Sequence, residues 1–237
     1  MASELIRLQL ESKFALLAKT LGANEATEKK WTNDFIARYT ESQRHYHTLA
    51  HIHAMLQCLD QFRPLAKDEI ALKLAIFFHD WIYDPTSKDN EIESVKCFNT
   101  FAGDIGLSDP ISSRIASYIE RTITHSLPPE IQEPDSDLGL FLDFDLEVLS
   151  RTEAEYARYA EQIRAEYSHL TLGDYNAGRA RVLRSFLDRD RLYFSDVFYE
   201  SSEQKARANL EHEISILEGA CKFSSLDYYI ATHKLLA

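Results

Sequence analysis

The stretch AIFFHDWIYDPTSKDNE, residues 75–91, places a histidine and an aspartate directly after an apolar run. Residues 75–78 have the composition of a buried helix, whereas a carboxylate is rarely buried unless it is paired or bound to a metal. His79 and Asp80 therefore mark either the point where the chain leaves the core or a pair of side chains that meet a common partner.

Apolar residues recur at helical intervals along most of the chain, and glycine and proline are scarce at 7 and 6 residues. This pattern predicts an all-α protein of roughly ten helices. The first helix is expected to end near Gly22 and another at His79. Ser87 is expected to cap the helix after the loop, and Ser201 with Gln204 resembles a capping box.

A length of 237 residues suits one sizeable domain or two small ones. The proline-rich segment HSLPPEIQEPDSD, residues 125–137, is short enough to be a loop inside one domain. We therefore expect a single helical domain over residues 1–237.

The net charge of −12 disfavours binding to a nucleic-acid polymer, because an acidic surface repels phosphate. The sequence has no run of about 18 apolar residues, so no membrane span is predicted, and the N-terminus lacks the organisation of a signal peptide. Cys58, Cys97 and Cys221 are far apart and odd in number, which favours free thiols over disulfides or zinc ligands. A cytoplasmic location is expected, and the oligomeric state cannot be read.

The segment RHYHTLAHIH, residues 44–53, holds four histidines, of which His47 and His51 lie four apart and share a helix face. Alone, it is equally consistent with a chance cluster or a solvated turn. With His79-Asp80 and an aspartate from FLDFDLEVLS, residues 141–150, it completes a set of two histidines and two aspartates. Such ligands suit octahedral divalent ions with positions left for water.

The ordered set His51, His79-Asp80 and Asp145 resembles the HD-domain metal-dependent phosphohydrolase superfamily. The resemblance is closer to a branch that opens with R-x-YH-x-x-x-H, which here runs from Arg44 to His51. Matching pieces extend from about residue 30 to about residue 218, and they include FHDWIYD, NEIES, TITHS and DFDLEVL. The resemblance implies the helical HD fold, with a core at about 44–150 and C-terminal helices, 151–237, that pack on it.

The resemblance also implies a role for each matching residue. The metal ligands would be His51, His79, Asp80 and Asp145. Asp143 is an alternative last ligand, because DFD offers two carboxylates, but Asp145 precedes a leucine as in the family. Asp80 would also orient the attacking water, and His47 would protonate the leaving oxygen.

Four further residues are candidates for contacts at or near the site. Arg44 offers a forked donor for phosphate oxygens, with a surface salt bridge as the alternative. Lys88 could line the site and contact substrate. His125 matches the place of a second-metal ligand or a substrate contact, with a loop histidine as the alternative. Glu91 could support the site or a second metal. Alternatively, it is a carboxylate in the first turn of a helix that the helix dipole stabilises without any site.

Together these features predict a metal-dependent hydrolase of phosphoester or phosphoanhydride bonds, with a nucleotide or similar small molecule as substrate. One divalent ion is expected (Mn, Fe, Co, Ni or Zn, with Mg also possible), and a second is left open. The alternatives are an iron oxygenase or lyase on the HD scaffold and a nucleotide-binding module without turnover.

Overall fold

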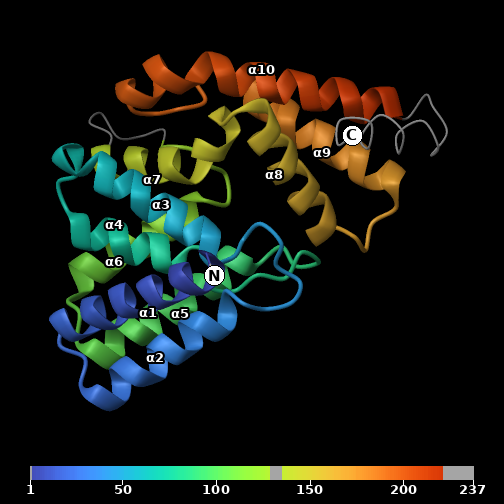
Figure 1. Cartoon of the computed structure of the whole chain (residues 1–237). Helices are drawn as coiled ribbons and strands as arrows, with labels where there is room; N and C mark the ends of the chain where they lie inside the picture. The colour runs from blue at the N-terminus through green and yellow to red at the C-terminus, as the bar shows by residue number, and fades with distance from the viewer. Residues whose placement is uncertain (1, 129–134, 221–237) are drawn as a thin grey trace. The chain divides into compact units, whose positions relative to one another are not determined.

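A computed structural model describes residues 2–128 and 135–220, and Cys221 lies outside these ranges. Within them the chain forms ten α-helices, two short 3₁₀ helices and no strand, so the all-α prediction is confirmed (Figure 1). The elements are α1 (Ala2–Thr20), α2 (Glu25–Arg38), α3 (Leu49–Gln61), η1 (Arg63–Leu65), α4 (Glu69–Phe78), α5 (Asn90–Ile105), α6 (Asp109–Arg121), α7 (Ser136–Leu146), η2 (Glu147–Ser150), α8 (Glu153–Glu166), α9 (Leu172–Leu187) and α10 (Asp196–Ala220).

The chain divides into two compact units, the first ending at Asp145 and the second beginning at Leu146. The first unit comprises α1 to α6 and nearly all of α7, and the second comprises η2 and α8 to α10. Each unit has its own buried residues. The grouping of both units into one domain, with an HD core and helices packed on it, stays a prediction.

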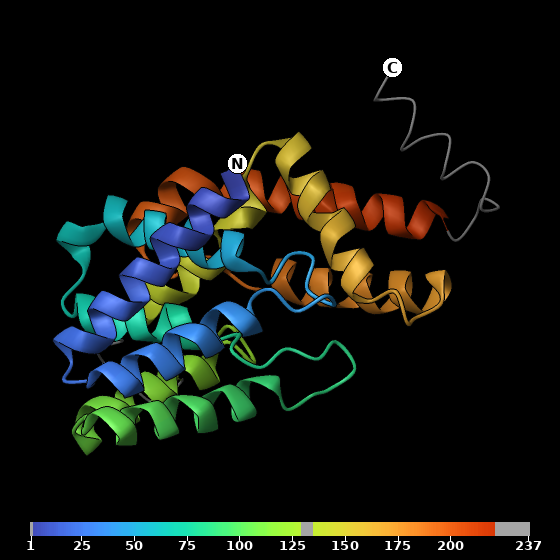
Figure 2. The ribbon, with the colours of Figure 1, turned by 60° about the horizontal axis from the view of Figure 1, so that its bottom comes forward.

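The core of the first unit is an aromatic cluster. In both views α1 and α2 lie side by side, with α5 close to α2 (Figures 1 and 2). Phe14 of α1 stacks on Phe35 of α2 with ring centroids 5.1 Å apart, and it meets Phe77 of α4 edge-on at 5.1 Å. Phe78 stacks on Trp81 at 4.4 Å. The apolar run before His79-Asp80 is therefore packed into this cluster, which fixes the position of the helix end.

Two expected helix starts were wrong. The helix after the loop begins at Asn90, and the Ser87 hydroxyl instead accepts a bond from the Asp89 amide ahead of the helix. The side chain of Asn90, the first residue of the helix, accepts from the Asp84 amide and donates to the Asp84 carbonyl. These two bonds close the loop before α5.

Ser201 does not cap a helix, because α10 already starts at Asp196. Its hydroxyl donates to the Val197 carbonyl within the helix. Phe198 is buried and extends the apolar face of α10 toward its start, so the helix begins before the expected cap. At the start of α8, Thr152 and Glu155 form a capping box.

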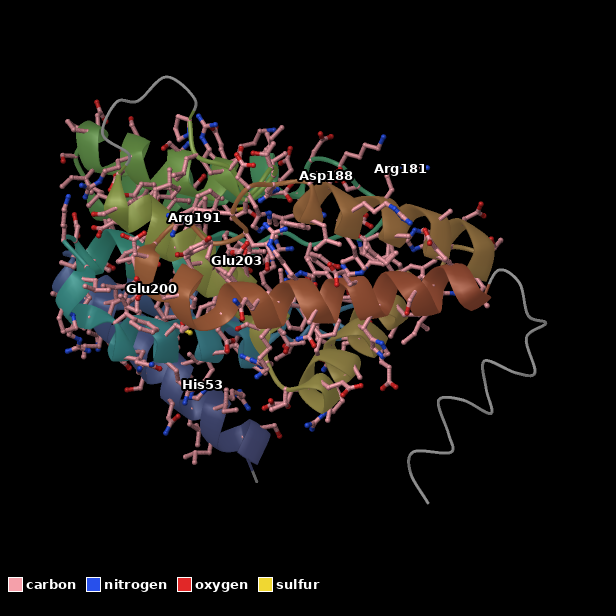
Figure 3. The ribbon with its side chains drawn as sticks, turned by 90° about the horizontal axis from the view of Figure 1, so that it is seen from above. His53, Arg181, Asp188, Arg191, Glu200 and Glu203 are labelled. Carbon is pink, nitrogen blue, oxygen red and sulfur yellow. The ribbon has the colours of Figure 1, made fainter. Side chains whose placement is uncertain are left out.

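In the second unit, Glu203 of α10 lies beside the segment that carries Arg191 (Figure 3). Its buried carboxylate accepts bonds from the amides of Leu192 and Tyr193 and from Arg207. These bonds fix the connection between α9 and α10. The Tyr193 hydroxyl donates to the carbonyl of Leu146, the first residue of the unit.

Candidate metal centre

Three elements of the first unit bring the candidate ligands together. His51 lies in the first turn of α3, whose start is capped by the Thr48 hydroxyl. His79 follows the last residue of α4, and Asp145 lies near the end of α7. Both histidines are buried among core residues, so their positions are set by the packing of α3 and α4.

His51, His79 and Asp145 form a group whose ligand atoms are close enough to hold one metal ion. The Nε2 atoms of the two histidines are 3.2 Å apart. Asp145 Oδ1 lies 3.1 Å from His51 Nε2 and 3.7 Å from His79 Nε2. Neighbouring ligands of an octahedral or tetrahedral ion with bonds near 2.1 Å lie about 3.0 to 3.4 Å apart. The spacings of 3.2 and 3.1 Å match that range, and the third, at 3.7 Å, is slightly longer.

The hydrogen bonding of His79 also fits a ligand. Its Nδ1 lies 2.9 Å from the Ile76 carbonyl. A carbonyl can only accept, so Nδ1 carries a hydrogen, and a neutral ring then offers the Nε2 lone pair to the cluster. Ligand histidines commonly have such an outer partner, which fixes ring orientation.

Asp80 stands at the edge of the same group. Its Oδ2 lies 3.0 Å from His79 Nε2 and 3.7 Å from His51 Nε2. The side chains of Asp80 and Asp145 are 17% and 12% exposed, whereas those of the two histidines are nearly inaccessible. The carboxylates are therefore the part of the group that solvent reaches. Asp143 is also buried, but Asp145 is the aspartate in the ligand group.

Charge coupling within the group shifts the pKa values. Burial would lower the pKa of His79, but Asp80 and then Asp145 outweigh it and raise the pKa to about 9. Burial lowers the pKa of His51 against the opposing effect of Asp145. Burial would raise the pKa of Asp80 and Asp145, yet the neighbouring histidines hold both well below the ordinary value. Both carboxylates are thus anionic and suited to a cation.

His125 lies beside the ligand group, just beyond the end of α6. Its Nε2 is 2.7 Å from Asp145 Oδ2, on the oxygen that does not face His51. His125 has a left-handed backbone with φ of 44°, which is uncommon for a non-glycine residue. Its amide still bonds to the Arg121 carbonyl. The structure thus brings His125 to Asp145, where it can orient that carboxylate.

His47 is held at the start of the segment leading into α3. Its ring stacks on Tyr83 with centroids 4.4 Å apart and lies 5.9 Å from the His51 ring. The charge of His47 is one of the influences that lower the pKa of Asp80. His47 is half-buried, whereas His53 lines a shallow groove with residues of α1 such as Leu8 and Lys13. Of these two histidines, His47 is the one close to the ligand group.

Arg44 does not have the expected role of a phosphate donor. Its side chain is 0% exposed and bonds to the Glu41 carboxylate and to the carbonyls of His47, Asp80 and Trp81. A buried guanidinium whose donors are directed at four protein oxygens has no access to a substrate phosphate. The assignment as a substrate ligand was therefore wrong.

Lys88 is exposed on the loop before α5, and Glu91 is half-buried in the first turn of that helix. Neither belongs to the ligand group found among the described residues. Their assigned roles stay predictions.

Three tyrosines near the site were not singled out from the sequence as site residues. Tyr46 has its ring centroid 4.9 Å from that of His51, and Tyr83 stacks on His47. Tyr39 donates its hydroxyl to the Phe77 carbonyl, two residues before His79. Tyr46 lies in RHYHTLAHIH and Tyr83 in FHDWIYD, so the motifs themselves could have indicated both residues, whereas Tyr39 has the spacing of an ordinary core residue.

Within the described part of the chain, no helix is long and apolar enough to cross a membrane. Comparison of the chain with protein-family models, with curated proteins and with solved structures finds no match in any of the three.

Proposed function

We propose that this protein is a metal-dependent phosphohydrolase that cleaves a small phosphorylated substrate. The observation that carries the proposal is the convergence of His51, His79 and Asp145 from three helices, with Asp80 3.0 Å from His79. These are the residues, in the same chain order, that the HD resemblance assigns as ligands. Two histidines with carboxylates suit Mn, Fe, Co, Ni or Zn, and to a lesser degree Mg.

Each residue has a role in the proposed hydrolysis. A divalent ion held by this group would lower the pKa of a coordinated water from about 15.7 toward about 7 and so supply hydroxide at neutral pH. Asp80, an anionic and partly accessible carboxylate, would orient the attacking water. His125 would hold Asp145 through its other oxygen.

His47 is the proposed general acid. When the phosphorus–oxygen bond breaks, the leaving oxygen needs a proton, and an imidazole titrates in the right range to give one. His47 lies next to the ligand group but is not part of it, and stacking on Tyr83 fixes its ring.

The substrate class rests on analogy alone. Nucleotides or nucleotide-like phosphoesters are the leading candidates, because HD proteins act on them. With Arg44 buried, a cation held by the ligand group, His47, His125 and the exposed Lys88 are the candidates to offset phosphate charge. The proposal includes a cytoplasmic location, where thiols such as Cys58 and Cys97 stay reduced.

The test begins with chelator-treated protein, reloaded separately with each candidate ion. It is assayed on p-nitrophenyl phosphate, bis-p-nitrophenyl phosphate and a nucleotide panel. Asp80→Ala should lose bound metal and activity together, and retention of both would contradict the proposal. His47→Gln should lose turnover but keep the metal, whereas the exposed His45 changed to glutamine is the matched control.

The same preparations separate the alternatives. Two tightly bound irons after anaerobic purification, with oxygen uptake, would favour an oxygenase. Tight nucleotide binding without hydrolysis by any metal form would favour a binding module.

A further inference from the structure

We propose that Arg44 is a positioning residue for the metal centre, which it serves by holding the backbone of the His79-Asp80 turn. The inference rests on the proposed metal site and assigns to it a residue that reaches neither metal nor substrate. Arg44 Nη1 donates to the Asp80 carbonyl at 2.8 Å and Nη2 donates to the Trp81 carbonyl at 3.0 Å.

The end of α4 explains why such a residue is needed. The last carbonyls of a helix have no partner within the helix, and buried ones must find another donor. Here the Ile76 carbonyl accepts from the His79 ring, and the Phe77 carbonyl accepts from the Tyr39 hydroxyl. Arg44 supplies the donors for the next part of the turn, at Asp80 and Trp81. A guanidinium at this position also complements the negative end of the helix dipole.

Arg44 also links this turn to the segment that carries His47 and leads into α3. Its Nη1 also donates to the His47 carbonyl at 3.1 Å, four residues before His51. One side chain thus ties the backbone of the proposed acid to the backbone of a proposed ligand. Arg44 itself is fixed, because Glu41 accepts from Nε at 3.1 Å and the guanidinium carbon lies over Tyr39 and Tyr83 at 4.8 and 5.3 Å.

Lysine cannot replace this arrangement, because a single ammonium cannot reproduce a planar fork aimed at several carbonyls. Arg44→Lys should therefore keep the positive charge but loosen the turn. Outer residues that orient metal ligands typically change metal affinity by about 10- to 100-fold, and we expect a loss of that size for Co²⁺.

The experiment compares the parent protein with Arg44→Lys, Glu41→Gln and Arg38→Gln. Glu41→Gln leaves the guanidinium in place but removes its charged anchor, so its effect should be smaller and in the same direction. Arg38 is the matched control, because it pairs with the same Glu41 carboxylate while its side chain is 38% exposed, in contrast to the inaccessible side chain of Arg44. Helix content by circular dichroism shows which variants fold.

Two readouts distinguish positioning from general stability. The first is the affinity and visible absorption spectrum of bound Co²⁺, which reports ligand geometry. The second is hydrogen exchange of residues 79–83 in metal-free protein. We expect Arg44→Lys to weaken Co²⁺ binding, alter the spectrum and speed exchange in this turn, with Arg38→Gln like the parent.

Unchanged Co²⁺ affinity and spectrum in a folded Arg44→Lys would overturn the proposal. If that variant does not fold, Glu41→Gln decides: a parent-like Co²⁺ spectrum and exchange overturn the proposal, and shifts in both support it. A parent protein that binds no Co²⁺ would instead refute the metal centre, and with it the premise of a positioning role.

Discussion

His51 Nε2 and His79 Nε2 lie 3.2 Å apart in the first unit, although 28 residues separate them in sequence. Two imidazole lone pairs facing each other at this distance repel, so a proton or a cation must lie between them. Asp145 contributes an oxygen 3.1 Å from His51 Nε2. In the metal-free protein a proton on His79 can fill this place, and with that proton released the two nitrogens and the carboxylate could hold a metal ion.

Removing the charge of Asp145 should therefore weaken metal binding strongly, while the similar size of asparagine preserves the packing. We expect Asp145→Asn to weaken Co²⁺ or Mn²⁺ binding by more than about 100-fold, beyond the range typical of outer residues. Titration of the chelator-treated protein measures this. His125→Gln, which alters only the hydrogen bond to the other oxygen of Asp145, should fall within about 10- to 100-fold. Equal affinities in Asp145→Asn and the parent would argue against the assigned ligand.

Metal binding should release a proton from His79. The pKa of His79 is raised to about 9 in the metal-free protein, so the ring is protonated at neutral pH and must lose that proton to bind an ion. Metal affinity should consequently rise about tenfold per pH unit between about pH 7 and pH 9, and level off above the pKa.

Calorimetry in buffers of different ionisation enthalpy counts the protons directly. A binding enthalpy that is the same in every buffer, together with a flat affinity from pH 7 to pH 9, would mean that His79 is already neutral before the ion arrives.

The sequence predicted the helical fold because a buried helix face repeats its apolar residues every three to four positions. This is why residues 75–78, including Phe77, could be identified as buried helix. The starts of α5 and α10 were wrong because serine, threonine and aspartate occur at several nearby positions that could each cap. Only the packed structure shows that Phe198 already belongs to the apolar face of α10.

The types of residue in the candidate site could be predicted from the sequence, but the hydrogen bonds that hold them in place could not. Histidine and aspartate in an apolar setting imply a partner, and the order of the motifs indicated which ones. Arg44 was misassigned because a motif gives the residue type and not the direction of the side chain. The bonds to Asp80 and Trp81 cross 36 and 37 residues, and no local pattern records them.

The aromatic cluster under the His79-Asp80 turn should dominate the stability of the first unit. Phe14 is 1% exposed and contacts Phe35 and Phe77, so Phe14→Ala should lower the free energy of unfolding by about 3–5 kcal/mol. Leu16 lies on the same helix at 67% exposure, and Leu16→Ala should change it by less than about 0.5 kcal/mol. Urea denaturation measures both. Similar losses in the two variants would show that the cluster is not packed as described.

The second unit has a buried ionic cluster whose disruption should destabilise the protein. Glu213 of α10 accepts two bonds from Arg179 of α9, at 2.9 and 3.2 Å, and one from the Tyr156 hydroxyl of α8. The side chains of Arg179 and Glu213 are only 11% and 8% exposed. Removing one charge from such a pair leaves the other buried without compensation, which costs far more than the pair itself contributes.

We therefore expect Glu213→Gln to destabilise the protein by about 3 kcal/mol, because the Arg179 guanidinium loses its counter-ion while the size of the side chain is kept.

Glu218→Gln is the matched control on the same helix. It removes an ion pair with Arg184, but both of those side chains are about half exposed, at 50% and 49%. That loss should stay below about 1 kcal/mol, since solvent and salt screen an exposed pair. Thermal and urea unfolding of the two variants compare the pairs directly. If Glu213→Gln proves as mild as Glu218→Gln, then water reaches Arg179, and α8, α9 and α10 do not enclose the cluster.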